Sequence, residues 1–219
     1  MDLLRQITEK PWLPQDAVER LHAERAIAAP AAKIGLRFFL AVVSVLFLLL
    51  IIAYAERMRF EAWRPGPQPV LLWLNTALLI LGSVGLQWAR VAANRRQIDG
   101  VRKGLMIGGF FTLAFLAGQI AAWRQLSGIP FFNMASPAIA FFYLITALHG
   151  VHIVGGLVAW GRATARVWRA SAVARPLQGS VDLCALYWHF LLLVWLVLFG
   201  LLFSGNGNID LLLALCGFR

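Results

Sequence analysis

Residues 141–160 read FFYLITALHGVHIVGGLVAW, a stretch long enough to span a bilayer that carries two histidines, His149 and His152, three residues apart. A histidine in hydrocarbon costs free energy unless it bonds to its own chain, to a neighbouring chain or to a cofactor. The pair therefore indicates either a functional site or a contact that holds helices together.

The rest of the chain has the same apolar character. Hydrophobic residues make up 60% of the 219 residues, and charges gather in short runs between apolar stretches, which is typical of a polytopic membrane protein. Five spans are each long enough to cross about 30 Å of hydrocarbon as a helix, and none alternates as a transmembrane barrel strand does. The spans are residues 34–54, 70–88, 104–123, 138–160 and 181–204. The sequence therefore predicts an all-α integral membrane protein, a bundle of five transmembrane helices.

Two flanking segments complete this single predicted domain. Residues 1–33 are charged and lack the apolar run of a secretory signal, so we expect them to stay on the chain. A short surface helix should begin there after Pro14 and end at Pro30. Residues 205–219 are too short to cross the membrane, and we expect them to form a short tail on its outer side.

The distribution of basic residues predicts the orientation. Lys and Arg gather in the N-terminal segment and in the loops after the second and fourth spans, and such enrichment marks the cytoplasmic side. The N-terminus is therefore expected in the cytoplasm and, after five crossings, the C-terminus outside. The net charge of +10 is then directed at anionic lipid headgroups and gives no indication of nucleic-acid binding.

Polar residues inside the spans fall at two depths. Helical rise counted from the span ends places His152 and His189 both about 12 Å from the inner boundary, with His149 one step deeper. Asn75 and Gln119 lie near the outer boundary, where they could bond each other. The spans are thus expected to hold an inner histidine layer and an outer amide layer.

Different interpretations of the histidine layer stay open. Neutral rings could hold the fourth and fifth spans together through bonds to Thr146 or to a backbone carbonyl. Alternatively, His152 and His189 could hold a haem between them, because Gly155 and Gly156 leave room for a flat ring. A proton relay is disfavoured because the acidic residues lie only at the span ends.

Glycines are predicted where two helices approach closely, since a residue without a side chain lets backbones touch. They cluster in the second, third and fourth spans, which are therefore the expected places of tight packing. These glycines are Gly82, Gly85, Gly104, Gly108, Gly109, Gly150, Gly155 and Gly156.

Four blocks carry a resemblance to subunit III of the haem-copper terminal oxidases, the cytochrome c oxidase subunit III family, over residues 33–204. The fourth span resembles the family's Phe-Phe, Thr-Gly, His-Gly, His-Val pattern, and the fifth resembles its Tyr-Trp-His-Phe block. A Leu-Asn-Thr tripeptide and a glutamine in the two preceding spans also match. The matching residues are Phe141, Phe142, Thr146, His149, Gly150, His152, Gly155, Tyr187, Trp188, His189, Phe190, Leu74, Asn75, Thr76 and Gln119.

The resemblance implies a five-helix form that lacks the first two family helices. It implies a non-catalytic subunit of a bacterial respiratory cytochrome c oxidase complex, multi-pass in the inner (plasma) membrane. Such a subunit packs directly against subunit I, which carries the haem and copper, and assembles with subunit II and other subunits of the complex. It binds phospholipid, holds no redox centre or metal, and supports O2 reduction and proton pumping by subunit I.

The departures from the family pattern concern acids. Where the family has three buried carboxylates, this chain has Val43, Ala122 and Leu192, and Ala147 replaces a glycine. By depth, two of these positions, 43 and 192, fall near the histidine layer. The resemblance therefore implies a family network of acids and histidines of which this chain keeps only the basic half.

Other functions are compatible with the same residues. Within the family, the chain could serve a quinol oxidase as subunit III or accompany a nitric oxide reductase, because the electron donor binds elsewhere. From a different class, a free-standing membrane electron carrier could use His152 and His189 as the two axial ligands of a haem.

Overall fold

The computed structural model describes residues 15–58, 70–127, 137–170 and 175–203, and within these ranges all regular structure is helical. The helices are α2 (Gln15–Met58), α3 (Leu71–Asn94), α4 (Ile98–Ser127), α5 (Pro137–Arg169) and α6 (Arg175–Phe203). Each of the five contains a stretch long and apolar enough to cross a membrane. The prediction of an all-α protein with five candidate membrane spans is confirmed, whereas the predicted outer tail, residues 205–219, lies outside the described residues.

The chain divides into two units, residues 1–39 and residues 40–219. In the first unit the chain is helical from Gln15 onward, and the prediction that a surface helix ends at Pro30 is wrong, because the helix continues through it. Proline loses one backbone hydrogen bond in a helix interior, but its fixed φ angle is helical. The flanking residues 28, 29, 31 and 32 are all alanine, the strongest helix former, and they offset that loss.

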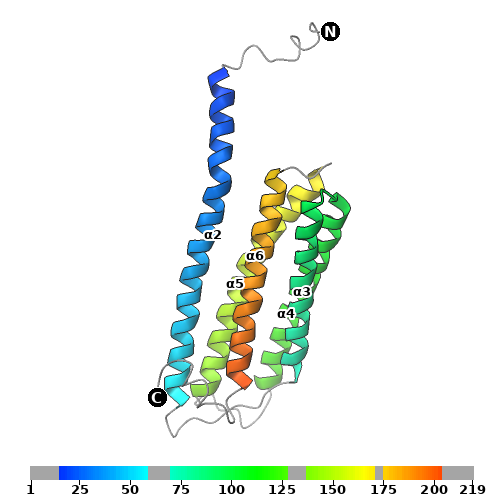
Figure 1. Ribbon diagram of the computed structural model, residues 1–219. Coiled ribbons are helices and arrows are strands. Elements are labelled where there is room, and N and C mark those ends of the chain that lie inside the picture. Colours follow the sequence, from blue (N-terminus) through cyan, green and yellow to red (C-terminus); the bar gives the residue numbers. More distant parts are fainter. Residues whose placement is uncertain (1–14, 59–69, 128–136, 171–174, 204–219) are drawn as a thin grey trace. The chain divides into compact units, whose positions relative to one another are not determined.

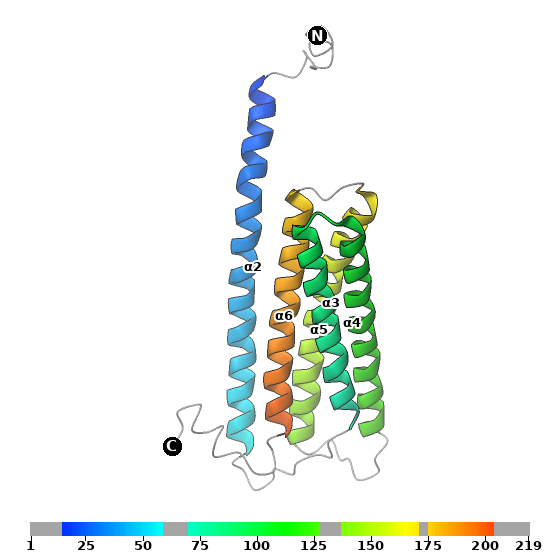
Figure 2. The same cartoon turned by 45° about the vertical axis from the view of Figure 1, so that its right-hand side comes forward.

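In the second unit, α3 to α6 stand side by side and each contacts two neighbours (Figures 1 and 2). The contacting pairs are α3 with α4, α4 with α5, α5 with α6, and α6 with α3. Residues 40–58 of α2 are attached through a stripe of three buried side chains, Val43, Phe47 and Tyr54, which belong to the same apolar cluster as Ile145 and Leu198. This stripe places residues 40–58 of α2 against α5 and α6.

Glycine determines how closely α3 and α4 approach. A side chain on Gly104 would come within 2.6 Å of the Ala89 backbone nitrogen, and one on Gly108 within 2.6 Å of the Leu86 side chain. A side chain on Gly85 would likewise lie 2.8 Å from Ile107. Because real Cβ atoms do not approach so closely, these glycines are required for the packing, as predicted.

The glycines of α5 behave differently from the prediction. A side chain on Gly156 would come within 2.6 Å of the Tyr187 ring, so this glycine does admit α6. Gly150 and Gly155 face open space, with no atom within 4 Å of an added Cβ, so they do not mediate contact between the described helices. The sequence pattern cannot separate these cases because it does not fix the rotation of α5 about its axis.

This difference predicts contrasting effects of one substitution. Gly104→Leu should destabilise the detergent-solubilised chain by about 1–3 kcal/mol or more, because overpacking forces α3 and α4 apart. Gly155→Leu should leave stability unchanged or raise it by up to about 1 kcal/mol, since leucine favours helix more than glycine does. Thermal unfolding of both variants tests this, and equal destabilisation would contradict the packing described here.

Candidate functional site

Three tryptophans tie the helices together through threonine. Each indole N–H donates to a hydroxyl on a neighbouring helix, and each hydroxyl donates in turn to the carbonyl four residues earlier in its own helix, at 2.7 or 2.8 Å. The pairs are Trp188 with Thr112 at 2.8 Å, Trp195 with Thr76 at 3.0 Å, and Trp123 with Thr146 at 3.1 Å. Every polar atom of these pairs is thus bonded without water.

The α3–α6 contact is a ladder of polar pairs. Its first pair is Trp195 with Thr76. Toward the end of α3, the next pairs are Ser83 with His189, Arg90 with Asp182, and the carbonyl of Ala93 with the amide of Gln178. Steps of seven residues along α3, from position 76 to 83 and 90, are matched by steps of six and seven back along α6. This constant register is that of two antiparallel helices packed along their length.

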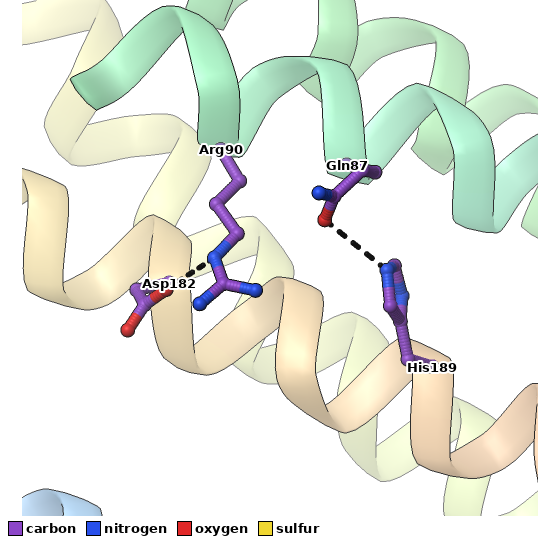
Figure 3. A network of polar contacts seen from close by, with 4 residues as sticks. All are labelled: Gln87, Arg90, Asp182 and His189. Carbon is purple, nitrogen blue, oxygen red and sulfur yellow. Dashed lines mark hydrogen bonds and ion pairs between the residues drawn. The ribbon is translucent and has the colours of Figure 1, made fainter.

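His189 is held on both sides by α3. Its Nδ1 lies 2.9 Å from the Ser83 hydroxyl and its Nε2 lies 3.2 Å from Oε1 of Gln87, as Figure 3 shows for the second contact. A neutral ring with its proton on Nε2 satisfies both bonds, because Ser83 then donates to Nδ1 and Nε2 donates to Gln87. The prediction that His189 bonds toward the fourth span is wrong, since its partners are on α3.

His149 has the opposite environment. Its side chain is fully buried, and neither ring nitrogen has a hydrogen-bond partner among the described residues. The rings of Phe47, Phe115 and Trp195 surround it at centroid distances of 6.3, 6.1 and 5.2 Å. The predicted bond to Thr146 is absent, because that hydroxyl bonds to Trp123 and to carbonyls of its own helix. His149 therefore carries an uncompensated cost of burial.

His152 bonds within its own helix. Its Nδ1 donates to the Leu148 carbonyl at 2.8 Å, and its ring lies 5.4 Å from Phe47 of α2. Its backbone carbonyl accepts the Tyr187 hydroxyl at 2.9 Å, which joins α5 to α6. The hydroxyl of Tyr187 and a backbone carbonyl therefore supply a bond between the fourth and fifth spans, where the prediction was a bond made by a histidine ring.

The two histidines proposed as haem ligands do not share a site. The Tyr187 bond confirms that His152 and His189 lie at similar depth, yet one ring faces α2 and the other faces α3. Both nitrogens of His189 are already engaged, so the arrangement does not fit a haem held between them. In the described ranges no group of three or more His, Cys, Asp or Glu side chains could hold a metal ion.

The outer amide layer is as predicted. Nδ2 of Asn75 donates to Oε1 of Gln119 at 3.2 Å, and both side chains are buried between α3 and α4. A side chain on the neighbouring Gly118 would collide with Oδ1 of Asn75, so this glycine makes room for the amide pair. Gly118 directly precedes Gln119 in the sequence, and this adjacency was an available sign that a glycine makes room for the amide pair.

The positions where the family has acids divide between two environments. Val43 and Ala122 are buried, whereas Leu192 is partly exposed. Val43 shares an apolar cluster with Phe47, one turn away on α2, and the Phe47 ring lies against both histidines of α5. Position 43 therefore faces the α5 histidines, while His189 of α6 is directed toward α3.

Sequence reasoning missed three polar residues of the α3–α6 ladder. Ser83, Gln87 and Arg90 are four and three residues apart on one face of α3, and the partners Asp182 and His189 are seven apart on α6. Polar residues that recur at helical spacing on two otherwise apolar helices indicate that the two helices face each other, and this signal was available in the sequence. The ion pair of Arg90 with Asp182, at 2.5 Å, lies one turn from the bond of Gln87 with His189 (Figure 3).

Comparison with known proteins agrees with these residues. The family model described as cytochrome c oxidase subunit III matches residues 24–205. A protein of Mycobacterium tuberculosis described as a probable cytochrome c oxidase subunit 3 is 31% identical over 144 residues, 64% of this chain and 70% of that relative. Cytochrome c oxidase subunit 3 of Thermostichus vulcanus is 29% identical over 78% of this chain and 85% of its own length. That of Synechocystis sp. is 30% identical over 77% and 73%.

The contrast between two histidines gives a prediction for stability. His189→Leu should destabilise the solubilised chain by about 1–3 kcal/mol, because Ser83 and Gln87 lose their partner. His149→Leu, the same change at a ring with unpaired nitrogens, should be neutral or stabilising by about 1 kcal/mol. Chemical or thermal unfolding of the two variants decides between them, and the reverse order would refute the assigned bonds.

A double-mutant cycle tests the environment of position 43. Val43→Glu buries a carboxyl group that needs a partner, and the α5 histidines are the titratable groups that face it. Its cost should therefore rise by about 1 kcal/mol or more when His152→Ala is added, whereas His189→Ala should add independently. Unfolding free energies of the three single and two double variants, compared with the unchanged chain, measure the coupling. Additivity in both cycles would place position 43 away from the histidines.

Proposed function

This chain belongs to the cytochrome c oxidase subunit III family, and on that premise we propose that it is a non-redox subunit of a bacterial respiratory cytochrome c oxidase. In this role it packs directly against subunit I, which carries the haem and copper, and assembles with subunit II. It holds phospholipid and supports the O2 reduction and proton pumping of subunit I.

One observation carries the structural role. In the described residues, many polar side chains of the spans bond to a neighbouring helix in pairs, whereas the ring nitrogens of His149 have no partner. The indole N–H groups end on threonines, and both nitrogens of His189 end on α3. Side chains used in this way fix the packing of helices. This supports placing haem and copper in the partner subunit.

Contact with subunit I is supported by two surfaces that the described helices leave exposed, one on α5 and one on residues 40–58 of α2. Gly150 and Gly155 meet no atom of this chain, so a partner helix could approach α5 there. Much of residues 40–58 of α2 is likewise exposed apolar surface, including Val42, Leu48 and Leu49. Substitution of these glycines by leucine should then affect assembly more than the stability of the chain itself.

The orientation follows from the charges at one end of the bundle. We define the basic end as the end where α3 and α5 finish and α4 and α6 begin; its described cationic residues are Arg90, Arg95, Arg96, Arg102, Lys103, Arg162, Arg166 and Arg169. Enrichment of this kind supports a cytoplasmic position for this end, with the N-terminus on the same side and the C-terminus outside. The corresponding membrane is the bacterial inner membrane.

Affinity purification of the full chain in mild detergent tests this function. We expect subunits I and II, with their haems, to copurify, and the separated chain to show no Soret band. The haem types and the donor oxidised by the purified complex also separate a cytochrome c oxidase from a quinol oxidase or a nitric oxide reductase. A Soret band from the chain alone that is lost in His152→Ala or His189→Ala would overturn the proposal.

A further inference from the structure

The side of α3 that faces away from the bundle carries a continuous exposed stripe. Its members recur at alternating steps of three and four residues, the repeat with which one helix packs along another. We define the α3 stripe as Ala77, Ile80, Val84, Gln87 and Val91, all of which are exposed. Because α3 contacts α4 and α6 and lies diagonally across the bundle from α5, the stripe is separate from the α5 surface assigned to subunit I.

Gln87 is the polar member of the α3 stripe, and it lies at the depth of the hydrocarbon. Its side chain bonds to His189, which helical rise places about 12 Å from the inner boundary. An acyl chain in contact with the stripe would leave the amide without a partner. The exposed stripe of α4 gives the contrast, since its members are all apolar and suit lipid: Met106, Phe110, Leu113, Ala117 and Ile120.

The amide nitrogen of Gln87 is the group that needs a partner. Oε1 lies 3.2 Å from Nε2 of His189, and in Figure 3 the amide nitrogen points away from that bond. Within the described helices no hydrogen bond engages this nitrogen. The oxygen keeps a second lone pair, so the amide offers both donors and an acceptor. A group that accepts and donates in the same way is therefore its best complement.

We propose that a second copy of this chain covers the α3 stripe, so that two stripes meet about a two-fold axis along the membrane normal. Two copies inserted with the same orientation present each residue at the same depth, and the same surface is used on both. Gln87 then meets Gln87 of the second copy, and each amide nitrogen donates to the other amide oxygen. The amide is its own complement in this arrangement.

The apolar members of the stripe fit a contact between two identical helices. Val84 and Val91 are one heptad apart, and β-branched residues at one of the two seam positions favour a two-stranded pair. Ile80 and Gln87 share the other seam position, where a single polar side chain fixes the register. Arg90 is turned toward Asp182 of α6, so the two copies do not meet through this cation.

Cysteine cross-linking tests the contact in membranes of cells that make the full chain with its complex. In a chain freed of its own thiols by Cys184→Ala and Cys216→Ala, Val84→Cys should give a covalent dimer of the chain on mild oxidation. Leu113→Cys is the matched control on α4, because the two positions are exposed to a similar extent, 60% and 53%. The control should stay monomeric, since the α4 stripe lies outside the contact.

Self-association of the solubilised full chain measures the role of the amide. Gln87→Leu should weaken the dimer about tenfold, the effect expected when hydrogen bonds between membrane helices are lost. His189→Leu removes the same bond within the chain but keeps the Gln87 amide, so its dimer should be retained. Val84→Trp overfills the stripe and should abolish the dimer, whereas Leu113→Trp should not. Thermal unfolding shows which variants are intact.

The cross-linked partner and the effect of the amide decide the outcome. Capture of subunit I or another chain at position 84, absence of a covalent dimer, or equal dimerisation of Gln87→Leu and the unchanged chain would each overturn the proposal. Copurification of subunit I from the same membranes scores the proposed function separately. A dimer without subunit I would count against that function alone, and subunit I without a dimer would count against this inference alone.

Discussion

Hydrocarbon offers no hydrogen bonds, so a polar side chain in a membrane bundle needs a partner within the protein. The indole–threonine pairs supply partners for the N–H groups of three tryptophans and connect α3 to α6. A threonine hydroxyl in a helix can donate to the carbonyl one turn earlier and still accept a second bond. The indole N–H is a donor only, so the two groups are complementary. Thr76, Thr112 and Thr146 are each used in this way, and the partners lie on different helices.

The same constraint explains why the ladder between α3 and α6 is polar along its length. Antiparallel helices present their matching positions at a fixed register, so one polar contact brings the next pair into reach one or two turns away. Thr76 with Trp195 and Ala93 with Gln178 lie at opposite ends of this register, and His189 lies between them. Misplacing one helix by a turn would separate all of these pairs together. The ladder therefore specifies alignment more than it adds stability.

The depth of a polar residue along the bundle could be predicted from the sequence, whereas the neighbouring helix that its side chain faces could not. Span positions and helical rise placed Asn75 level with Gln119, and His152 level with His189, and both relations hold. Rotation about the helix axis depends on which neighbour each face meets, and a uniformly apolar span carries little signal for it. For this reason the sequence predicts the wrong neighbour for His189, and it does not separate Gly155 from Gly156 although only Gly156 meets α6.

His149 is buried without the hydrogen bonds that a polar side chain in an apolar core requires. Its ring is enclosed by three aromatic rings, and both nitrogens stay unpaired among the described residues. The ring therefore packs as one more aromatic side chain of the core. Val43 is apolar and faces the same aromatic group through Phe47. An acid at position 43 would need a partner among the α5 histidines, because an unpaired buried carboxyl group is costly. The histidine side of such a network is held here by aromatic packing, at the cost of the unpaired nitrogens of His149.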